Sequence, residues 1–394
     1  MTAVRTALVI GGGIAGPVTA LALHRAGIEA TVYESYPGTA DGIGGSLALA
    51  PNGQAALDVV GAREAVVADT LPIPRTVMSF GARNVELPQL AGLPPMRLLH
   101  RADVHRALHD IAVARGIRVE HGKRLVGADE GPDTVTARFA DGTTATADVL
   151  IGADGIHSTV RTMIDPAAPG PDYTGLLGFE AVVDRPVPGD TGVMHFAFGR
   201  RAYYLYWRRP DGRTHWGANL PRPRPMTLTE ARAVPPGEWL RELRATYGDD
   251  DPAGDLVRHI DPDGLATTGA LYIMPPVPHW HRGRMALVGD AVHAPSNSSG
   301  QGASLAVESA VELARALRDH PTPEAAFTAY ERRRRARTEE IAARAGRINQ
   351  VKAPGPLTSA VLPLLMRLLM RTAMRPEKAF GPTQRHLIDW DAPA

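Results

Sequence analysis

The sequence predicts an α/β fold in which the first domain carries an inserted, mainly β domain and is followed by C-terminal helices. Three observations predict it. An apolar run at residues 6–10 leads into a glycine-rich turn, and helical apolar spacing continues to Gly27. Residues 171–270 contain long stretches typical of β-strands. Helical spacing returns at residues 301–317, which indicates that the chain re-enters the first domain after the insertion.

Length and composition agree with two folded domains. The chain has 394 residues, which is too long for one ordinary hydrophobic core. Hydrophobic residues make up 44% and charged residues 22%, so the composition favours a compact globular protein over a disordered one. We expect residues 1–70, 100–170 and 271–350 to form the first domain, residues 71–99 and 171–270 the inserted sheet domain, and residues 351–394 a helix packed on the domains.

Charge and cysteine content exclude several classes of function. The 43 basic and 42 acidic residues leave a net charge of +1, too small to attract nucleic acid or an anionic membrane. Without cysteine there is no disulfide, no thiolate nucleophile and no cysteine-ligated metal centre, and no motif indicates another metal site. The N-terminus lacks the pattern of a signal peptide, so we expect a cytoplasmic protein.

Local signals place the remaining elements. Pro17 suits a first helical turn and Gly27 a helix C-terminus. Further strands are expected at residues 30–34, 117–120, 134–139, 144–151 and 285–289, with a turn at residues 141–142. In the insertion, residues 202–208 and 214–220 flank a turn at 210–212 and predict a hairpin.

Two later segments could be mistaken for binding elements. The run Arg332–Arg335 lies in an expected helix at residues 324–346, and the nearby glutamates favour a solvated face over a nucleic-acid site. Residues 356–374 are strongly apolar but contain Pro363, Arg367 and Arg371, so we expect no membrane span. A packed amphipathic helix is favoured over a membrane-surface anchor.

The glycine-rich turn carries the first chemical signal. Gly11, Gly13 and Gly16 have GxGxxG spacing after a strand and before a helix, and Glu34 ends the next strand. Such glycines allow the tight turn, the approach of a pyrophosphate and close helix packing, while an acidic residue about 20 residues onward accepts hydrogen bonds from a ribose. The pattern predicts a dinucleotide site without choosing between FAD and NAD.

Two later motifs make that choice. Residues 152–161 read GADGIHSTVR after an apolar strand, and residues 289–293 read GDAVH after another. Taken singly, either could be an ordinary turn. Their order, with Gly300, Gln301 and Gly302 ten residues after Asp290, resembles the group A flavoprotein monooxygenases, the para-hydroxybenzoate hydroxylase-like family. The resemblance spans about residues 4–345.

The resemblance implies an FAD-binding Rossmann-like domain of the GR2 type with an inserted substrate-binding sheet domain. It implies that Asp154 and Gly155, with Arg161 close behind, serve both FAD and NAD(P)H, and that Arg101 reaches the FAD phosphates. The residues that it predicts to contact FAD are Gly11, Gly13, Ile14, Ala15, Gly16, Glu34, Arg101, Asp154, Gly155, Gly289, Asp290, Gly300, Gln301, Gly302 and Ala303.

The function implied by the resemblance is an FAD-dependent monooxygenase. NADH or NADPH would reduce the flavin, O2 would give a C4a-hydroperoxyflavin, and a small aromatic or polycyclic substrate would be hydroxylated or epoxidised. An oxidase or cyclase of the same fold and a non-catalytic flavin-binding protein remain alternatives. A WxWxIP motif is absent, which disfavours halogenation. We expect a monomer or homodimer.

Candidate substrate residues come from the insertion and two loops. The pocket candidates are Gly45, Ser46, Phe198, Tyr204, Tyr206, Trp216 and Pro295. The aromatic residues have an alternative role as sheet core, because strand alternation turns only some of them to each face. His293 follows the GD motif and could act as a base, although a structural role is favoured. Ser35, where many relatives carry Arg, and the early Pro295 depart from the family's pattern.

Overall fold

The computed structural model describes residues 4–38, 45–68, 70–81, 83–87, 89–351 and 376–394. A six-stranded sheet lies in the first part of the molecule, in the order β18, β19, β12, β1, β2, β8. Its strands are β1 (Thr6–Ile10), β2 (Glu29–Tyr33), β8 (Arg118–Glu120), β12 (Val149–Gly152), β18 (His281–Arg282) and β19 (Met285–Leu287). β1 pairs in parallel with both β2 and β12. The two central strands, β1 and β12, are almost continuous apolar runs and are buried nearly throughout, as in a sheet covered on both faces.

Helices pack around this sheet and each other. α1 (Ala15–Arg25) packs against α10 (Gly302–Asp319), which in turn contacts α2 (Pro51–Val59). α10 is buried along most of its length, with Val307, Val311 and Ala314 each at most 1% exposed. The other helices here are α3 (Arg63–Val67), α4 (Arg101–Ala114), α5 (Thr159–Ile164), α9 (Asp290–His293) and the 3-10 turn η2 (Asn297–Ser299).

A small antiparallel sheet follows the first crossover. It consists of β9 (Leu125–Glu130), β10 (Val135–Phe139) and β11 (Thr144–Ala147), and the turn at residues 141–142 joins β10 to β11 as expected. The expectation of one strand over residues 144–151 was wrong. The chain breaks at Asp148, whose carboxylate accepts hydrogen bonds from the backbone of Arg5 and Thr6, and β12 continues in the large sheet.

A seven-stranded sheet forms the other end of the molecule, in the order β17, β13, β16, β15, β14, β5, β6. Its strands are β5 (Arg75–Phe80), β6 (Arg83–Leu87), β13 (Asp172–Val183), β14 (Val193–Phe198), β15 (Tyr203–Arg208), β16 (Thr214–Pro221) and β17 (Ala266–Ile273). The pairing of β15 with β16 confirms the hairpin predicted from residues 202–208 and 214–220. α6 (Leu228–Ala233), α7 (Pro236–Tyr247), α8 (Ala253–Arg258) and the 3-10 turn η1 (Pro262–Gly264) follow β16.

The two faces of this sheet have different neighbours. Phe179, Ala218 and Leu220 pack with Leu240 and Leu243 of α7 in one core cluster, so one face lies under the helices. Met194 and Trp207 on the other face cluster with Ile73. Ile73 belongs to a three-stranded sheet of β3 (Ser46–Leu49), β7 (Met96–His100) and β4 (Leu71–Ile73). The second face therefore meets the element that leads into α4.

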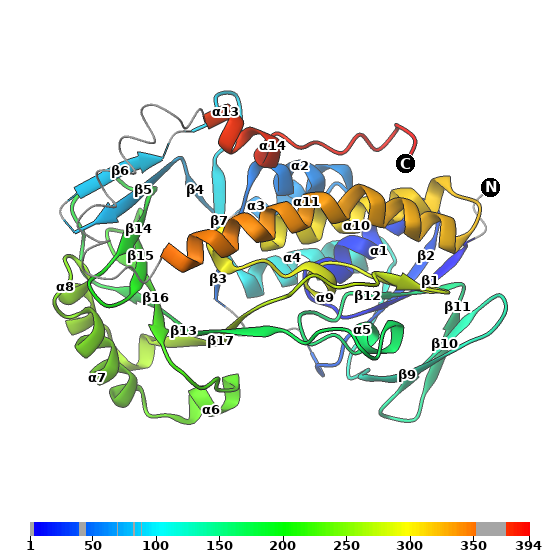
Figure 1. Cartoon of the computed structure of the whole chain (residues 1–394), viewed down its shortest axis with the longest axis horizontal. Coiled ribbons are helices and arrows are strands. Elements are labelled where there is room, and N and C mark those ends of the chain that lie inside the picture. Colours follow the sequence, from blue (N-terminus) through cyan, green and yellow to red (C-terminus); the bar gives the residue numbers. More distant parts are fainter. Residues whose placement is uncertain (1–3, 39–44, 69, 82, 88, 352–375) are drawn as a thin grey trace.

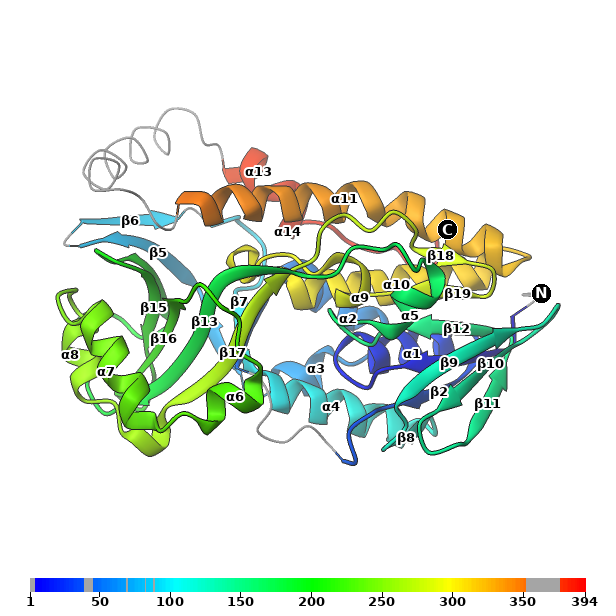
Figure 2. The same ribbon diagram turned by 60° about the horizontal axis from the view of Figure 1, so that its bottom comes forward.

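Long elements connect the two ends. In the seven-stranded sheet, β13 and β17 extend toward α5 (Figure 1, Figure 2). α11 (Pro323–Val351) runs along α10 over much of the length of the molecule (Figure 1, Figure 2). α13 (Pro376–Ala379), α14 (Gly381–Gln384) and the C-terminal segment lie beside α11 (Figure 1). Arg333 of α11 donates a hydrogen bond to the carbonyl of Pro393. The chain's end is thus fastened to the first domain.

The arginine run of α11 corrects one expectation. Arg332 and Arg333 are exposed, but Arg334 is 1% exposed and pairs with a buried carboxylate, so the run is not one solvated face. The expected helix at 356–374 lies outside the described residues. Within the residues that the structure describes, no helix is both long and apolar enough to cross a bilayer.

Candidate active site

The glycine-rich turn after β1 is shaped by close backbone contacts. Gly11 has φ +104°, and a Cβ atom there would lie 2.5 Å from the carbonyl oxygen of Ala153. A Cβ atom on Gly16 would lie 1.9 Å from the carbonyl oxygen of Gly11. Gly13 differs, because its Cβ would meet nothing within 4 Å. Glycine is thus required by the protein's own packing at positions 11 and 16, whereas Gly13 borders open space.

Glu34 closes one side of the turn. Its carboxylate accepts a 2.6 Å hydrogen bond from the backbone of Gly12 and another from the backbone of Tyr36, and the residue is 8% exposed. The first turn of α1 has no side-chain cap and no acidic residue, so its backbone amides keep their capacity to bind an anion. Turn and carboxylate therefore suit a ligand that carries both phosphate and hydroxyl groups.

The Asp154 segment reaches the same place from β12. The Asp154 carboxylate accepts hydrogen bonds from Ser158 Oγ and from the backbone of Thr159 and Val160, so it caps α5. Burial raises the pKa of Asp154, and these hydrogen bonds oppose the rise. Arg161 is 3% exposed and donates to the carbonyl oxygen of Ala291 in α9. The arginine therefore joins the two later motifs.

Gly289 and Asp290 lie between the turn and α10. Gly289 has φ +65°, and a Cβ atom there would lie 2.8 Å from the Cβ of Ala15 and 3.4 Å from that of Ala306. Partial burial raises the pKa of Asp290, and the guanidinium of Arg101, 4.0 Å away, opposes the rise. The Asp290 side chain keeps 37% of its surface exposed. This carboxylate therefore remains accessible at the junction of α4 and α9.

The N-terminus of α10 completes the cluster. Gly302 and Ala303 begin this 18-residue helix, and the N-cap Gln301 gives no side-chain cap to the helix amides. The Gln301 side chain instead accepts a hydrogen bond from Asn52. A Cβ atom on Gly302 would lie 4.0 Å from Pro295, and Ala303 shares a small apolar cavity with Ile14. The uncapped helix end has the partial positive charge that would stabilise an anion.

Contacts bring the predicted cofactor residues together. Ala153 meets Gly11, Ala15 meets Gly289, Ile14 meets Ala303, and Arg101 meets Asp290. Gly155 and Gly300 both have positive φ angles, in the turns before α5 and α10. Gly45 is connected to this cluster of predicted cofactor residues, because its carbonyl oxygen accepts a hydrogen bond from the backbone of Arg101.

The aromatic pocket candidates divide between the two faces of the seven-stranded sheet. Phe198 stacks on Phe80 at 4.7 Å and shares the face of Trp207. Tyr204, Tyr206 and Trp216 lie on the other face, in the core with α7 and α8, and are 3%, 7% and 0% exposed. The expectation that these three line a pocket was wrong, because the helices after β16 cover their face.

Sequence reasoning missed the polar residues on the face of the seven-stranded sheet that carries Trp207 and lies opposite α7, which we call the inner face. His215 is paired with Glu180 at 3.4 Å between Nε2 and Oε2, and its ring stacks on Trp207 at 3.9 Å. The strand period contained this signal, because His215 and Trp216 are neighbours and must point to opposite faces. Choosing the aromatic residue selected the core face.

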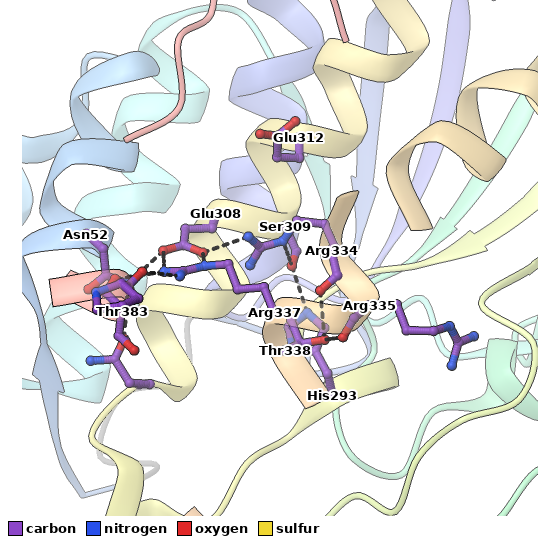
Figure 3. A network of polar contacts seen from close by, with 12 residues as sticks. Asn52, His293, Glu308, Ser309, Glu312, Arg334, Arg335, Arg337, Thr338 and Thr383 are labelled. Atoms are coloured by element: carbon purple, nitrogen blue, oxygen red, sulfur yellow. Dashed lines mark hydrogen bonds and ion pairs between the residues drawn. The ribbon is translucent and has the colours of Figure 1, made fainter. Parts of the chain in front are cut away.

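His293 is part of the interior rather than a site for proton transfer. Burial, aided by the nearby Arg334, lowers the pKa of His293 to about 3, so the ring is uncharged at neutral pH. Its Nε2 forms a 2.7 Å hydrogen bond with Ser309 Oγ of α10 (Figure 3). This placement corrects the candidate catalytic role of His293.

A buried ion-pair network lies behind the cluster. Glu308 of α10 is 0% exposed and contacts Arg334 and Arg337 of α11 at 2.7 and 2.9 Å (Figure 3). Asn52 donates to both Glu308 and Gln301, which links the network to the start of α10. These contacts hold α2, α10 and α11 in a single arrangement.

Comparison with known proteins identifies the family. Residues 4–204 and 276–345 match the family described as "FAD binding domain". The chain belongs to this family. The 3-amino-4-hydroxybenzoate 2-monooxygenase of Streptomyces cremeus is 32% identical over 362 residues, which cover 86% of each chain. The FAD-dependent urate hydroxylase of Klebsiella pneumoniae is 29% identical over 353 residues, covering 86% of this chain and 88% of the relative.

Solved structures share the fold of this FAD-binding family. HpxO of Klebsiella pneumoniae in complex with FAD and uric acid superimposes with a TM-score of 0.80 at 24% identity, over 97% of this chain and 96% of that one. The expected resemblance to group A flavoprotein monooxygenases and the α/β fold with an FAD-binding domain are therefore confirmed.

The site of this flavoprotein fits FAD on its own geometry. The open space beside Gly13 is bordered by the uncapped start of α1, and the Glu34 carboxylate beside the turn is an acceptor suited to hydroxyl groups. The start of α10 offers a second set of free amides. An elongated ligand with a pyrophosphate in its centre matches this order of donors and acceptors.

Proposed function

We propose that this chain is an NAD(P)H-dependent monooxygenase that transfers one oxygen atom of O2 to a small aromatic or heterocyclic substrate. The observation that carries the proposal is the convergence of the Gly13 turn, the Arg101–Asp290 pair and the start of α10 near the inner face of the seven-stranded sheet. FAD bound there would supply hydride acceptance and oxygen activation. Relatives named for an aminohydroxybenzoate, a hydroxynicotinate and urate support a ring-shaped, polar substrate.

The protein's own residues would bind and orient the reactants. Backbone amides near Gly13 would hold the pyrophosphate, Glu34 the ribose, and Arg101 with Asp290 the middle of the cofactor. The amides of Gly302 and Ala303 would stabilise negative charge on the reduced ring system, because they point along the axis of an 18-residue helix. Phe80 and Phe198 would form an apolar surface that limits water near the substrate.

Two measurements test the proposal in sequence. The purified protein is examined for the visible absorbance of bound flavin, and NADH or NADPH is then added without oxygen. Bleaching of that absorbance, followed by 18O transfer from O2 to an added ring compound, supports a monooxygenase. If the flavin is reduced but hydrogen peroxide is the only product formed from O2, across a panel of such ring compounds, the result would instead indicate an oxidase. A colourless protein that takes up no FAD would contradict the proposal.

A paired substitution tests the cofactor site. Gly13→Leu places a side chain in the open space that the pyrophosphate would fill, and no protein atom within 4 Å opposes its Cβ. We expect a folded protein that has lost FAD. Gly237→Leu is the matched control, since a Cβ there also meets nothing within 4 Å and Gly237 lies far along the chain in α7. Equal FAD content in the two variants would refute the placement.

A further inference from the structure

A carboxylate–imidazole pair lies on the inner face of the seven-stranded sheet. Glu180 of β13 and His215 of β16 are on adjacent strands, with 3.4 Å between Glu180 Oε2 and His215 Nε2. Their side chains are 20% and 10% exposed. Removing two ionisable groups from water costs free energy, and a hydrophobic pair could fill the same space. Stability of the sheet therefore does not explain the pair.

Glu180 is held as a carboxylate by converging donors. Ser46 donates to it from the backbone at 2.9 Å and from Oγ at 3.0 Å. Burial would raise the pKa of Glu180, but the imidazole of His215, 3.4 Å away, and the hydrogen bonds from Ser46 outweigh it and the pKa is lowered. Glu180 is the charged group that the described residues place against His215. Trp207 of β15 stacks on one face of the imidazole ring, with 3.9 Å between the ring centroids.

The pair is connected to the proposed cofactor site through one short loop. Ser46 follows Gly45, whose carbonyl oxygen accepts a hydrogen bond from the backbone of Arg101. A Cβ atom on Gly45 would lie 2.4 Å from Glu180 Oε1, so glycine permits this close approach. The same Arg101 pairs with Asp290. The imidazole therefore lies on the side of the sheet that faces the proposed flavin site.

We propose that His215 is the base that accepts the proton of a ring hydroxyl on the substrate, and that Glu180 is its positioning residue. The inference rests on the proposed function. A carboxylate opposite Nε2 favours the tautomer with the proton on Nε2, which leaves Nδ1 as the acceptor. The substrate class is thus a phenol or a hydroxylated nitrogen heterocycle.

The proton transfer is balanced within the pair and the substrate. The substrate O–H bond breaks, its electron pair stays on oxygen, and the proton forms a bond to Nδ1 of His215. The resulting imidazolium faces the carboxylate of Glu180, which stabilises it as in other carboxylate–histidine pairs. The substrate oxyanion enriches the ring in electrons at the carbons ortho and para to it, which prepares those carbons for attack on an electrophilic oxygen.

The test uses the FAD-loaded protein without NAD(P)H, so that it does not depend on turnover. The probes are 4-nitrophenol, whose phenolate absorbs at longer wavelength than the phenol, and 4-nitroanisole, which has no proton to lose. Binding is measured at a pH about one unit below the pKa of free 4-nitrophenol, where the neutral phenol predominates. We expect the phenolate band to appear on binding of 4-nitrophenol to the wild-type protein.

Variants separate the roles of the two residues. His215→Asn should abolish the phenolate band and weaken 4-nitrophenol binding at least about tenfold, a loss of about 1.4 kcal/mol, while 4-nitroanisole binding stays unchanged. Glu180→Gln should lower the bound phenolate fraction, and Glu180→Asp should restore part of it. A residue with a purely structural role would alter binding of both probes alike.

His195→Asn is the matched control. His195 is also partly buried in this sheet, but it stacks on Tyr206 on the helix-covered face. It should leave the phenolate band unchanged. The inference is overturned if wild-type protein binds no 4-nitrophenol, binds it as the neutral phenol, or keeps the phenolate band in His215→Asn. If the wild-type protein fails this test but still shows flavin reduction and 18O transfer, the proposed function stands and only the inference about His215 is overturned.

Discussion

Replacing Glu308 by Gln should destabilise the protein strongly, because this carboxylate neutralises two arginines inside the molecule. Glu308 is 0% exposed, and Arg334, its partner at 2.7 Å, is 1% exposed. Arg337 and Asn52 also donate to it. Glutamine retains the shape of the side chain but removes the charge, so Arg334 would be left buried without a counter-ion.

The structure allows two estimates of the cost. Burial would raise the pKa of Glu308, but the arginines hold it at about 2, below its ordinary value of 4.5. At ~1.4 kcal/mol per pKa unit, this difference corresponds to about 3 kcal/mol in favour of the charged form. Breaking a buried ion pair by removing one partner typically costs about 3–5 kcal/mol. With an unfolding entropy of about 2.1 cal/mol/K per residue, a loss of this size lowers Tm by about 4 °C.

Thermal unfolding of the FAD-loaded protein, followed by circular dichroism, measures this change. The control is Glu340→Gln, which removes the exposed ion-pair partner of Arg344 within α11. This change should shift Tm by less than about 1 °C. The lowered pKa of Glu308 means that its contribution is present above the unfolded pKa and is lost as pH falls through the folded one. The two proteins should therefore converge between about pH 4.5 and pH 2. Equal Tm values for Glu308→Gln and its control at neutral pH would refute the reasoning.

Three further substitutions test other parts of the structure. Burial lowers the pKa of His293 to about 3, so stability should fall as pH drops below about 6.5, where the unfolded chain takes up the proton. His293→Asn should flatten that fall in thermal unfolding measured at several pH values, and an unchanged slope would contradict the assignment. Gly289→Ala should cost more than about 1 kcal/mol in chemical denaturation, because φ is +65° and the new Cβ would lie 2.8 Å from Ala15; a neutral effect would exclude that geometry. The guanidinium groups of Arg25 and Arg318 both pack on the ring of Trp390, 4.9 and 4.8 Å from its centre. Trp390→Ala should therefore destabilise by about 3 kcal/mol and speed proteolysis of the C-terminal segment, whereas wild-type cleavage rates would show that this segment does not depend on the stacking.

Local sequence determined the elements whose signals depend on near neighbours. The strand–turn–helix unit around Gly11 and Gly16 could be predicted because backbone sterics and helix packing require glycine at both positions, whereas Gly13 belongs to the pattern because it leaves room for a ligand. The hairpin of β15 and β16 followed from two β-rich runs about a short turn. The assembly of the Gly289 and Gly302 segments with the turn was an inference from family resemblance, and contacts between distant parts of the chain now join them.

Tertiary structure alone decided which side chains face which neighbour. Alternation assigns His215 and Trp216 to opposite faces, but it does not say that α7 covers the face of Trp216 while β3 meets that of His215 through Glu180. The same limit applied to Arg334, whose charge suggested solvent until α10 supplied Glu308. In each case the environment comes from an element distant in sequence, so its burial and charge cannot be obtained from a local pattern.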